Sequence, residues 1–243
     1  MLSDLLYSLK ETEFFFNLFG YISFRSGLSL VTSFFIVIIL MPHWIRFQKS
    51  IFPSGQPIRN DGPDTHYHKK GTPTLGGVLI LFSIILSSIL WTSNFSSFNY
   101  ILILTLTLFG LIGLVDDFQK VKLGKGISSK TKFLSQLLAT LIIYFTIKYN
   151  GFDLNKFSIP FLKDVSIELG YLYFVLILLI VVGSTNATNL TDGLDGLVSM
   201  PLIFVFLTFA IFAYVLGNMN FSDYLLVNYI NGSGEIVIFC TSA

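Results

Sequence analysis

Charged residues and cysteine are both scarce in this sequence. Charged side chains make up 12% of the 243 residues, about half of the roughly 25% typical of soluble domains, which argues against a water-soluble fold. The formal net charge of +1 gives no indication of a nucleic-acid partner. The single cysteine, Cys240, excludes an internal disulfide and a cysteine metal cluster. The N-terminus lacks the pattern of a cleaved signal peptide, so membrane insertion must depend on internal segments.

Apolar residues are abundant by contrast, at 53% of the chain, and they occur in long runs. Runs of about 20 apolar residues can cross a bilayer as helices. We therefore expect an all-α fold, a polytopic transmembrane helix bundle that forms a single integral membrane domain over residues 1–243. Small residues in "LGG" (75–77), Gly110 and Gly113 are expected to permit close helix contacts. Six spans and the start of a seventh near Glu235 are predicted, the six at 28–45, 75–92, 98–115, 133–149, 170–185 and 197–216.

Six crossings divide the connecting segments into two alternating sets that differ in positive charge. Lysine and arginine accumulate on the cytoplasmic side of membrane proteins. This rule places the N-terminus outside and the more basic set in the cytoplasm. That set carries ten of the fifteen basic residues: Arg46, Lys49, Arg59, Lys69, Lys70, Lys120, Lys122, Lys125, Lys130 and Lys132. The opposite set carries the other five: Lys10, Arg25, Lys148, Lys156 and Lys163.

The segment "DGPDTHYHKKGTPTLGG" (61–77) is the first of three dense polar stretches on the predicted cytoplasmic side. Thr72 or Thr74 can cap the helix that follows. A helix N-terminus that points into water offers free N–H groups and a positive dipole, a natural seat for phosphate. Lys69 and Lys70 stand directly before it. The alternative is an ordinary capped helix with a basic flank that reaches back to the membrane interface.

Asp116 and Asp117 end an apolar span in the second segment, "GLVDDFQKVKLGKG" (113–126). A carboxylate at the bilayer centre costs about 2.5–3.5 kcal/mol on insertion scales, so the pair belongs at the membrane boundary. Acids at a helix C-terminus oppose the helix dipole, and a divalent cation such as Mg²⁺ would compensate. The side chains of adjacent helical residues point about 100° apart, so the two acids are expected to have different roles. The alternative is a charged stop at the membrane edge.

The third segment, "VVGSTNATNLTDGLDGLVSM" (181–200), combines amides and acids. Asn186 and Asn189 each begin an N-glycosylation pattern, but both lie beside a span on the basic side, which makes glycosylation a poor explanation. Asp192 and Asp195 are three apart and would share one face of a helix. The acids do not follow the alternating pattern of a calcium loop. A plain polar turn is the alternative.

The three segments together are more informative than any one of them. Phosphate-seating groups, lysines and two acid pairs converge on one membrane face. Transfer of a phosphate-bearing group at that surface would need a metal ion to neutralise phosphate charge and lysines to hold the donor.

At "HYHKKGTPTLGG", "GLVDDFQKVKLGKGISSKTKFLSQ" and "NATNLTDGLDGL" the sequence resembles the polyprenyl-phosphate N-acetylhexosamine-1-phosphate transferases, glycosyltransferase family 4. It is most similar to the branch that uses a UDP-linked muramoyl-pentapeptide, because branches with other amino-sugar donors lack the first segment and the basic run through Lys132. The resemblance implies metal binding and catalysis by three acids, without deciding which acid does which: Asp116, Asp117 and Asp192. It implies diphosphate or nucleotide binding by Lys69, Thr74, Lys120, Lys132, Asn186 and Asn189.

The reaction that the resemblance implies is a Mg²⁺-dependent phosphoglycosyl transfer. UDP-N-acetylmuramoyl-pentapeptide and undecaprenyl phosphate would give UMP and the first lipid-linked precursor of peptidoglycan, which serves cell-wall biogenesis, cell shape and division. The expected location is the bacterial inner membrane, with a multi-pass topology, the active face in the cytoplasm and the bilayer itself as a partner. A homodimer is considered, and no nucleic acid is expected.

The family pattern continues past the last residue, Ala243, with further spans, another metal-binding Asp and a His-rich loop. We therefore expect a chain that lacks the C-terminal third of the family, as a fragment or a truncated product, with little or no activity if it is complete as given. Two alternatives stay open within and outside the enzyme class. One is a sister transferase with another UDP-N-acetylamino sugar; the other is an anion transporter or an inactive membrane fragment.

Overall fold

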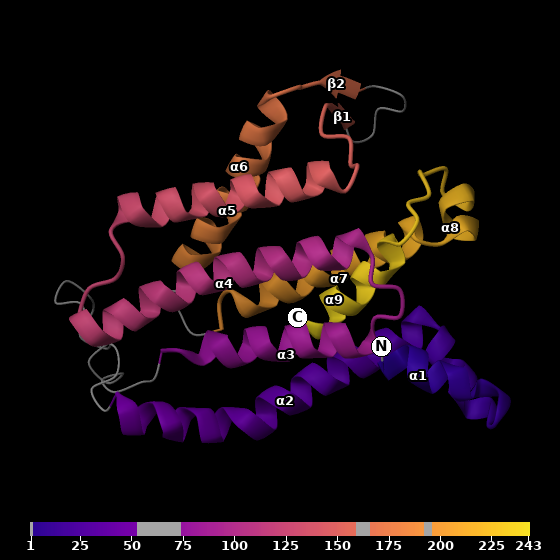
Figure 1. Cartoon of the computed structure of the whole chain (residues 1–243), viewed down its shortest axis with the longest axis horizontal. Coiled ribbons are helices and arrows are strands. Elements are labelled where there is room, and N and C mark those ends of the chain that lie inside the picture. Colours follow the sequence, from indigo (N-terminus) through magenta and orange to yellow (C-terminus); the bar gives the residue numbers. More distant parts are fainter. Residues whose placement is uncertain (1, 53–73, 159–165, 192–195) are drawn as a thin grey trace. The chain divides into compact units, whose positions relative to one another are not determined.

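The structure, a computed structural model, describes residues 2–52, 74–158, 166–191 and 196–243 (Figure 1). Helices occupy all six predicted spans and the start of the seventh, which confirms the all-α polytopic membrane bundle. The predicted ranges correspond to α2 (Ile22–Ile51), α3 (Gly76–Trp91), α4 (Ser97–Leu123), α5 (Ser129–Tyr149), α6 (Leu172–Thr191), α7 (Ser199–Leu216) and α9 (Ile236–Ser242).

Shorter elements between the long helices were not predicted, because three to seven residues carry too little periodicity to detect. They are α1 (Leu2–Ser8), η1 (Leu9–Glu11), η2 (Phe14–Gly20), β1 (Lys156–Ser158), β2 (Ser166–Glu168), α8 (Met219–Tyr224) and η4 (Ser233–Glu235).

Four of the described helices are long and apolar enough to cross a membrane, namely α2, α4, α6 and α7, so the chain is a multi-pass membrane protein. Helix α3 and the segment Ser233–Ser242 are apolar but shorter. Helix α5 is not among the four, although it is helical over the predicted span 133–149, because polar and charged residues such as Gln136 and Lys148 interrupt its apolar run. A membrane crossing by α5 stays a prediction.

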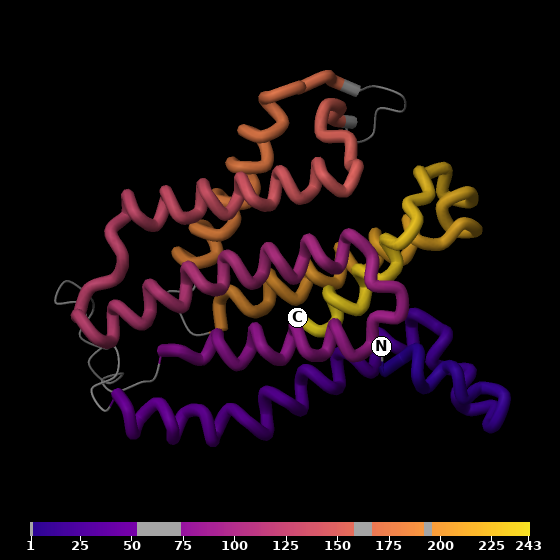
Figure 2. The backbone as a smooth tube through the Cα atoms, viewed as in Figure 1, coloured from indigo at the N-terminus to yellow at the C-terminus, as the bar shows by residue number. Residues whose placement is uncertain are grey.

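The chain divides into two compact units, residues 1–127 with 203–243 and residues 128–202. In the first unit, α2, α3 and α9 pack together, and α3 also contacts α4. Serine side chains line this contact: Ser29 donates to the carbonyl of Ile238 at 3.1 Å, and the hydroxyls of Ser88 and Ser242 lie 2.9 Å apart. Figure 2 shows the end of α9 running beside α3. Small polar residues let membrane helices approach closely.

Glycine contributes to this packing at one of the predicted positions. A Cβ atom on Gly110 would collide with the side chain of Leu81, so α4 approaches α3 closely there, as predicted. The same expectation is wrong for Gly76, Gly77 and Gly113, where an added Cβ meets no atom within 4 Å among the described residues.

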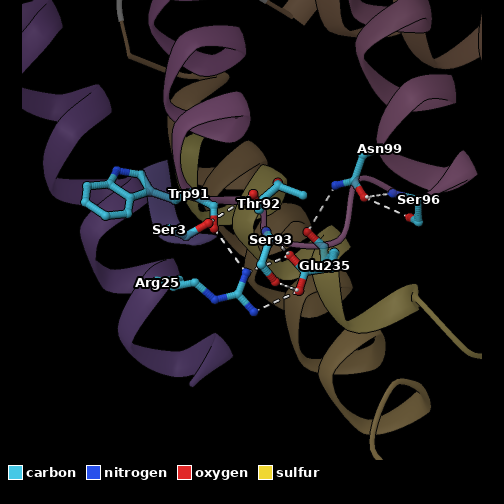
Figure 3. Close-up of polar contacts among 8 residues, drawn as sticks. All are labelled: Ser3, Arg25, Trp91, Thr92, Ser93, Ser96, Asn99 and Glu235. Carbon is cyan, nitrogen blue, oxygen red and sulfur yellow. Dashed lines mark hydrogen bonds and ion pairs between the residues drawn. The ribbon is translucent and has the colours of Figure 1, made fainter. Parts of the chain in front are cut away.

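An ion pair closes one end of the first unit (Figure 3). The guanidinium of Arg25 donates to both carboxylate oxygens of Glu235 at 2.8 Å and to the carbonyl of Trp91 at 3.0 Å. The amide and hydroxyl of Ser93 also donate to Glu235, and Asn99 donates to its backbone carbonyl. The side chains of Arg25 and Glu235 are only 3% and 7% exposed. This cluster joins α2, α4 and η4 with the chain segment after α3.

The second unit contains α5, the antiparallel strands β1 and β2, α6 and the first residues of α7. Helices α5 and α6 pack against each other, with Tyr144 and Phe174 in an edge-to-face contact at 5.3 Å. The two strands pair antiparallel, with Lys156 opposite Glu168. Ser128 caps α5 by accepting a hydrogen bond from the Thr131 amide at 3.2 Å.

Candidate functional site

The acidic pair occupies the last turns of α4, where the apolar part of the helix has ended. Asp116 is buried, with 7% of its surface exposed, whereas Asp117 is half-buried. The ammonium of Lys120 contacts both carboxylates, at 2.8 Å from Asp116 Oδ2 and 2.9 Å from Asp117 Oδ1. This is possible because residues three and four positions apart share a helix face. One lysine thus partly neutralises two acids that oppose the helix dipole.

The segment after α4 folds back over Asp116. Helix α4 ends at Leu123, and its C-cap Gly124 has a positive φ of 72° that reverses the chain. The Ile127 amide then donates to Asp116 Oδ1 at 2.9 Å. A Cβ on Gly126 would lie 2.5 Å from the same oxygen, so a larger residue would displace either the backbone or the Asp116 carboxylate. Both oxygens of Asp116 therefore have fixed donors, Ile127 on one and Lys120 on the other.

The phosphate-binding site predicted before α3 lies only partly within the described residues. Helix α3 begins at Gly76 with Leu75 as its N-cap, and no side chain caps it, so the prediction that Thr74 caps this helix is wrong. The reason is that the helix begins one residue too late for Thr74 to be the N-cap. The indole of Trp44 donates instead to the Leu75 carbonyl at 3.0 Å, which ties α2 to the start of α3. The other predicted residues of this site, Lys69, Lys70 and Thr72, lie outside the described residues.

The amide-rich patch begins inside a helix and not in a connection. Helix α6 continues to Thr191, six residues past the predicted span end at 185, and carries Asn186 and Asn189. Asn189 is exposed, whereas Asn186 is half-buried and donates to Gln136 Oε1 at 3.1 Å and to the Val182 carbonyl at 2.8 Å. Asp192 and Asp195 lie outside the described residues.

The structure thus groups the predicted residues by unit. The first unit contains Thr74 and brings Asp116, Asp117 and Lys120 into direct contact. Thr74 and these three lie at the same end of the antiparallel α3–α4 pair, opposite the short connection between the helices (Figure 1). The second unit contains Lys132, which is half-buried on α5, with Asn186 and Asn189 on α6.

The described residues supply an incomplete set of metal ligands. Among them, no group of three or more His, Cys, Asp or Glu side chains could hold a metal ion. Asp116 and Asp117 offer two neighbouring carboxylates that already attract one ammonium group. Mg²⁺ is typically held by one or two carboxylates together with phosphate oxygens of a substrate. The pair would therefore fit a Mg²⁺ ion whose other ligands come from a bound phosphate. It fits less well an ion held by protein ligands alone.

Three features of the structure were not predicted. Gly126 and the Ile127 amide reach Asp116 through a turn that is visible only once the chain is folded. Gln136 could have been noticed in the sequence, because a glutamine inside the apolar run "FLSQLLATLII" needs a hydrogen-bonding partner. The ion pair of Arg25 with Glu235 joins residues 210 positions apart and has no local signal.

Comparisons with known proteins show which family this chain is similar to. Residues 99–234 match glycosyl transferase family 4, a range that includes the Asp116–Lys120 turn and the Asn186 patch. The phospho-N-acetylmuramoyl-pentapeptide-transferase of Desulfotalea psychrophila is 41% identical over 243 residues, which cover 99% of this chain and 67% of that protein. The protein of the same name from Rickettsia prowazekii is 40% identical, with the same coverage.

Proposed function

Because the chain belongs to glycosyl transferase family 4, we propose that it transfers phospho-N-acetylmuramoyl-pentapeptide from a UDP carrier to undecaprenyl phosphate. UMP would be released, and the product would be the first lipid-linked precursor of peptidoglycan. The observation that carries this proposal is the cluster at the end of α4, where Lys120 and the folded-back Ile127 amide hold two adjacent carboxylates. The relatives that match nearly the whole chain carry the name of this reaction.

A site at the end of a membrane helix suits the two substrates. The isoprenoid tail of the acceptor can stay in the bilayer while its phosphate reaches the polar end of α4. The nucleotide donor is water-soluble and would arrive from the cytoplasm. The excess of basic residues on this side of the chain supports a cytoplasmic active face, with the N-terminus outside and the protein in the bacterial inner membrane.

The two acids differ in what they can still contact. Oδ1 of Asp116 accepts a hydrogen bond from the Ile127 amide, and Oδ2 forms an ion pair with Lys120. Asp116 is therefore fixed in place and serves to orient Lys120. Asp117 is more exposed, and its hydrogen-bond partner among the described residues is Lys120, through Oδ1. We therefore assign substrate contact to Asp117 before Asp116. In direct attack, an oxygen of the lipid phosphate bonds to the sugar-bearing phosphorus, and the bond to UMP breaks as UMP leaves.

Mg²⁺ is part of the proposal because the donor set described above fits it. When bound, the ion would neutralise diphosphate charge. The acids of this chain that would hold the ion are Asp116, Asp117 and Asp192, and Asp117 or Asp192 would accept a proton from the lipid phosphate. Contacts to the diphosphate or the nucleotide are assigned to Lys69, Thr74, Lys120, Lys132, Asn186 and Asn189.

The test compares carboxylate-to-amide changes in the product of the full reading frame that contains residues 1–243. Asp117→Asn and Asp192→Asn should lower the rate of UMP release by at least about a hundredfold, as expected for loss of a group that acts on the reacting phosphate. Asp223→Asn, an exposed acid outside the proposed site, is the matched control and should leave the rate unchanged. Normal turnover in both site variants with normal membrane insertion would refute the proposal.

A further inference from the structure

Gln136 and Asn186 form a polar contact between two apolar helices of the second unit. Gln136 lies on α5 and is 2% exposed, whereas Asn186 lies on α6 and is half-buried. The Asn186 amide nitrogen donates to Gln136 Oε1 at 3.1 Å and to the Val182 carbonyl, one turn earlier on α6, at 2.8 Å. Burial of a glutamine among apolar residues is unfavourable unless it is hydrogen-bonded. Leucine would pack better at this position, so packing alone does not explain why a glutamine is buried here.

The hydrogen bonds determine which way the Asn186 amide points. A backbone carbonyl can only accept, so the group that faces Val182 at 2.8 Å must be the amide nitrogen. Its second hydrogen goes to Gln136 Oε1. Both hydrogens of the nitrogen are then used, and Asn186 can offer only its Oδ1 to a ligand. Among the described residues, that oxygen has no hydrogen-bond donor.

We propose that Gln136 is a positioning residue for the donor nucleotide. It does not touch the substrate but holds the Asn186 amide so that Oδ1 faces the ligand as an acceptor for an N–H or O–H group. This inference rests on the proposed function, in which Asn186 contacts the donor. With Gln136 replaced, the amide keeps only the bond to Val182 within its own helix, and the torsion that places Oδ1 becomes free.

Three variants test this role by steady-state kinetics of UMP release. Gln136→Leu keeps the volume but removes the acceptor, and should raise the donor KM about tenfold, as expected for one lost hydrogen bond, with the acceptor KM little changed. Gln136→Glu keeps an acceptor for the Asn186 amide and should restore the donor KM to within about threefold of the wild type. Thr140→Val removes a buried hydroxyl whose partner is the Gln136 backbone carbonyl, and should leave the donor KM unchanged.

A double-mutant cycle separates positioning from general stability. If Gln136 acts through Asn186, Gln136→Leu with Asn186→Ala should have the same donor KM as Asn186→Ala alone. Additive effects, or an equal rise of KM in Thr140→Val, would refute the positioning role. An active wild type with an unchanged donor KM in Gln136→Leu would refute this role alone. A wild type that releases no UMP would refute the proposed function, and this role with it.

Discussion

A Cβ atom on Gly126 would lie 2.5 Å from Oδ1 of Asp116, so the backbone after α4 approaches this carboxylate as closely as glycine permits. The close approach brings the next amide, that of Ile127, within 2.9 Å of the same oxygen. The acid is thereby held from two sides, by a backbone amide and by Lys120. The loop that follows α4 is therefore part of the candidate site.

Gly126→Ala should therefore lower activity without unfolding the protein. The methyl group would displace either the loop or Asp116, and loss of the Ile127 hydrogen bond to a charged group is expected to cost about 1.5–3 kcal/mol. We expect the rate of UMP release to fall by at least about tenfold. Gly113→Ala on the same helix is the matched control, because a Cβ there meets no atom within 4 Å among the described residues. Equal rates in the two variants would show that the loop contact has no part in activity.

Removal of Arg25 should destabilise the first unit. Among the described residues, Arg25→Met leaves the buried carboxylate of Glu235 with Ser93 as its side-chain and backbone donor, and breaking such a pair typically costs about 3–5 kcal/mol. Thermal unfolding in detergent should show a large decrease in Tm. The double variant with Glu235→Met should recover part of that loss, because no uncompensated charge stays buried.

Lys10→Met serves as the control for this prediction, because Lys10 is an exposed cation whose hydrogen bond is to the nearby Tyr7. Its Tm should change little. A Tm for Arg25→Met equal to that of the control would contradict the structural role of the ion pair.

The predicted sidedness can be tested with single cysteines. The native Cys240 is buried, so it gives little background with a membrane-impermeant maleimide. Lys156 is exposed at β1, and Lys156→Cys should react in cells whose outer membrane alone has been permeabilised. Lys125 is exposed after α4, and Lys125→Cys should react only after the inner membrane is permeabilised as well. The reverse pattern would place the candidate site outside the cytoplasm.

The positions of the helices along the chain were predictable where one physical signal dominated the sequence. Apolar run length located α3 to within one residue at each end, 75–92 against Gly76–Trp91, since a membrane helix is defined by its length of apolar sequence. The same signal placed the end of α6 too early, because helix formation continues through polar residues once they leave the bilayer. The patch around Asn186 is thus helical up to Thr191.

Pairing between distant segments was not predictable. The partner of Glu235 lies 210 positions earlier, and the partner of Asn186 lies 50 positions earlier. The residues next to Glu235 and Asn186 in the sequence do not indicate which distant residue each one contacts. Only packing of the helices shows that one is an internal ion pair and the other an amide held in a fixed orientation. A cationic partner for the acidic pair was predictable, because two carboxylates at a membrane boundary need compensation, and Lys120 contacts both of them.

The most direct measurement is release of UMP by the purified product of the full reading frame that contains residues 1–243. UDP-N-acetylmuramoyl-pentapeptide, undecaprenyl phosphate and Mg²⁺ are supplied together, and each is then omitted in turn. We expect UMP and a lipid-linked muramoyl-pentapeptide in equal amounts, no product without the lipid phosphate or after chelation of Mg²⁺, and no comparable rate with UDP-N-acetylglucosamine. Release of UMP from the latter donor in preference, or no release with any donor, would contradict the account.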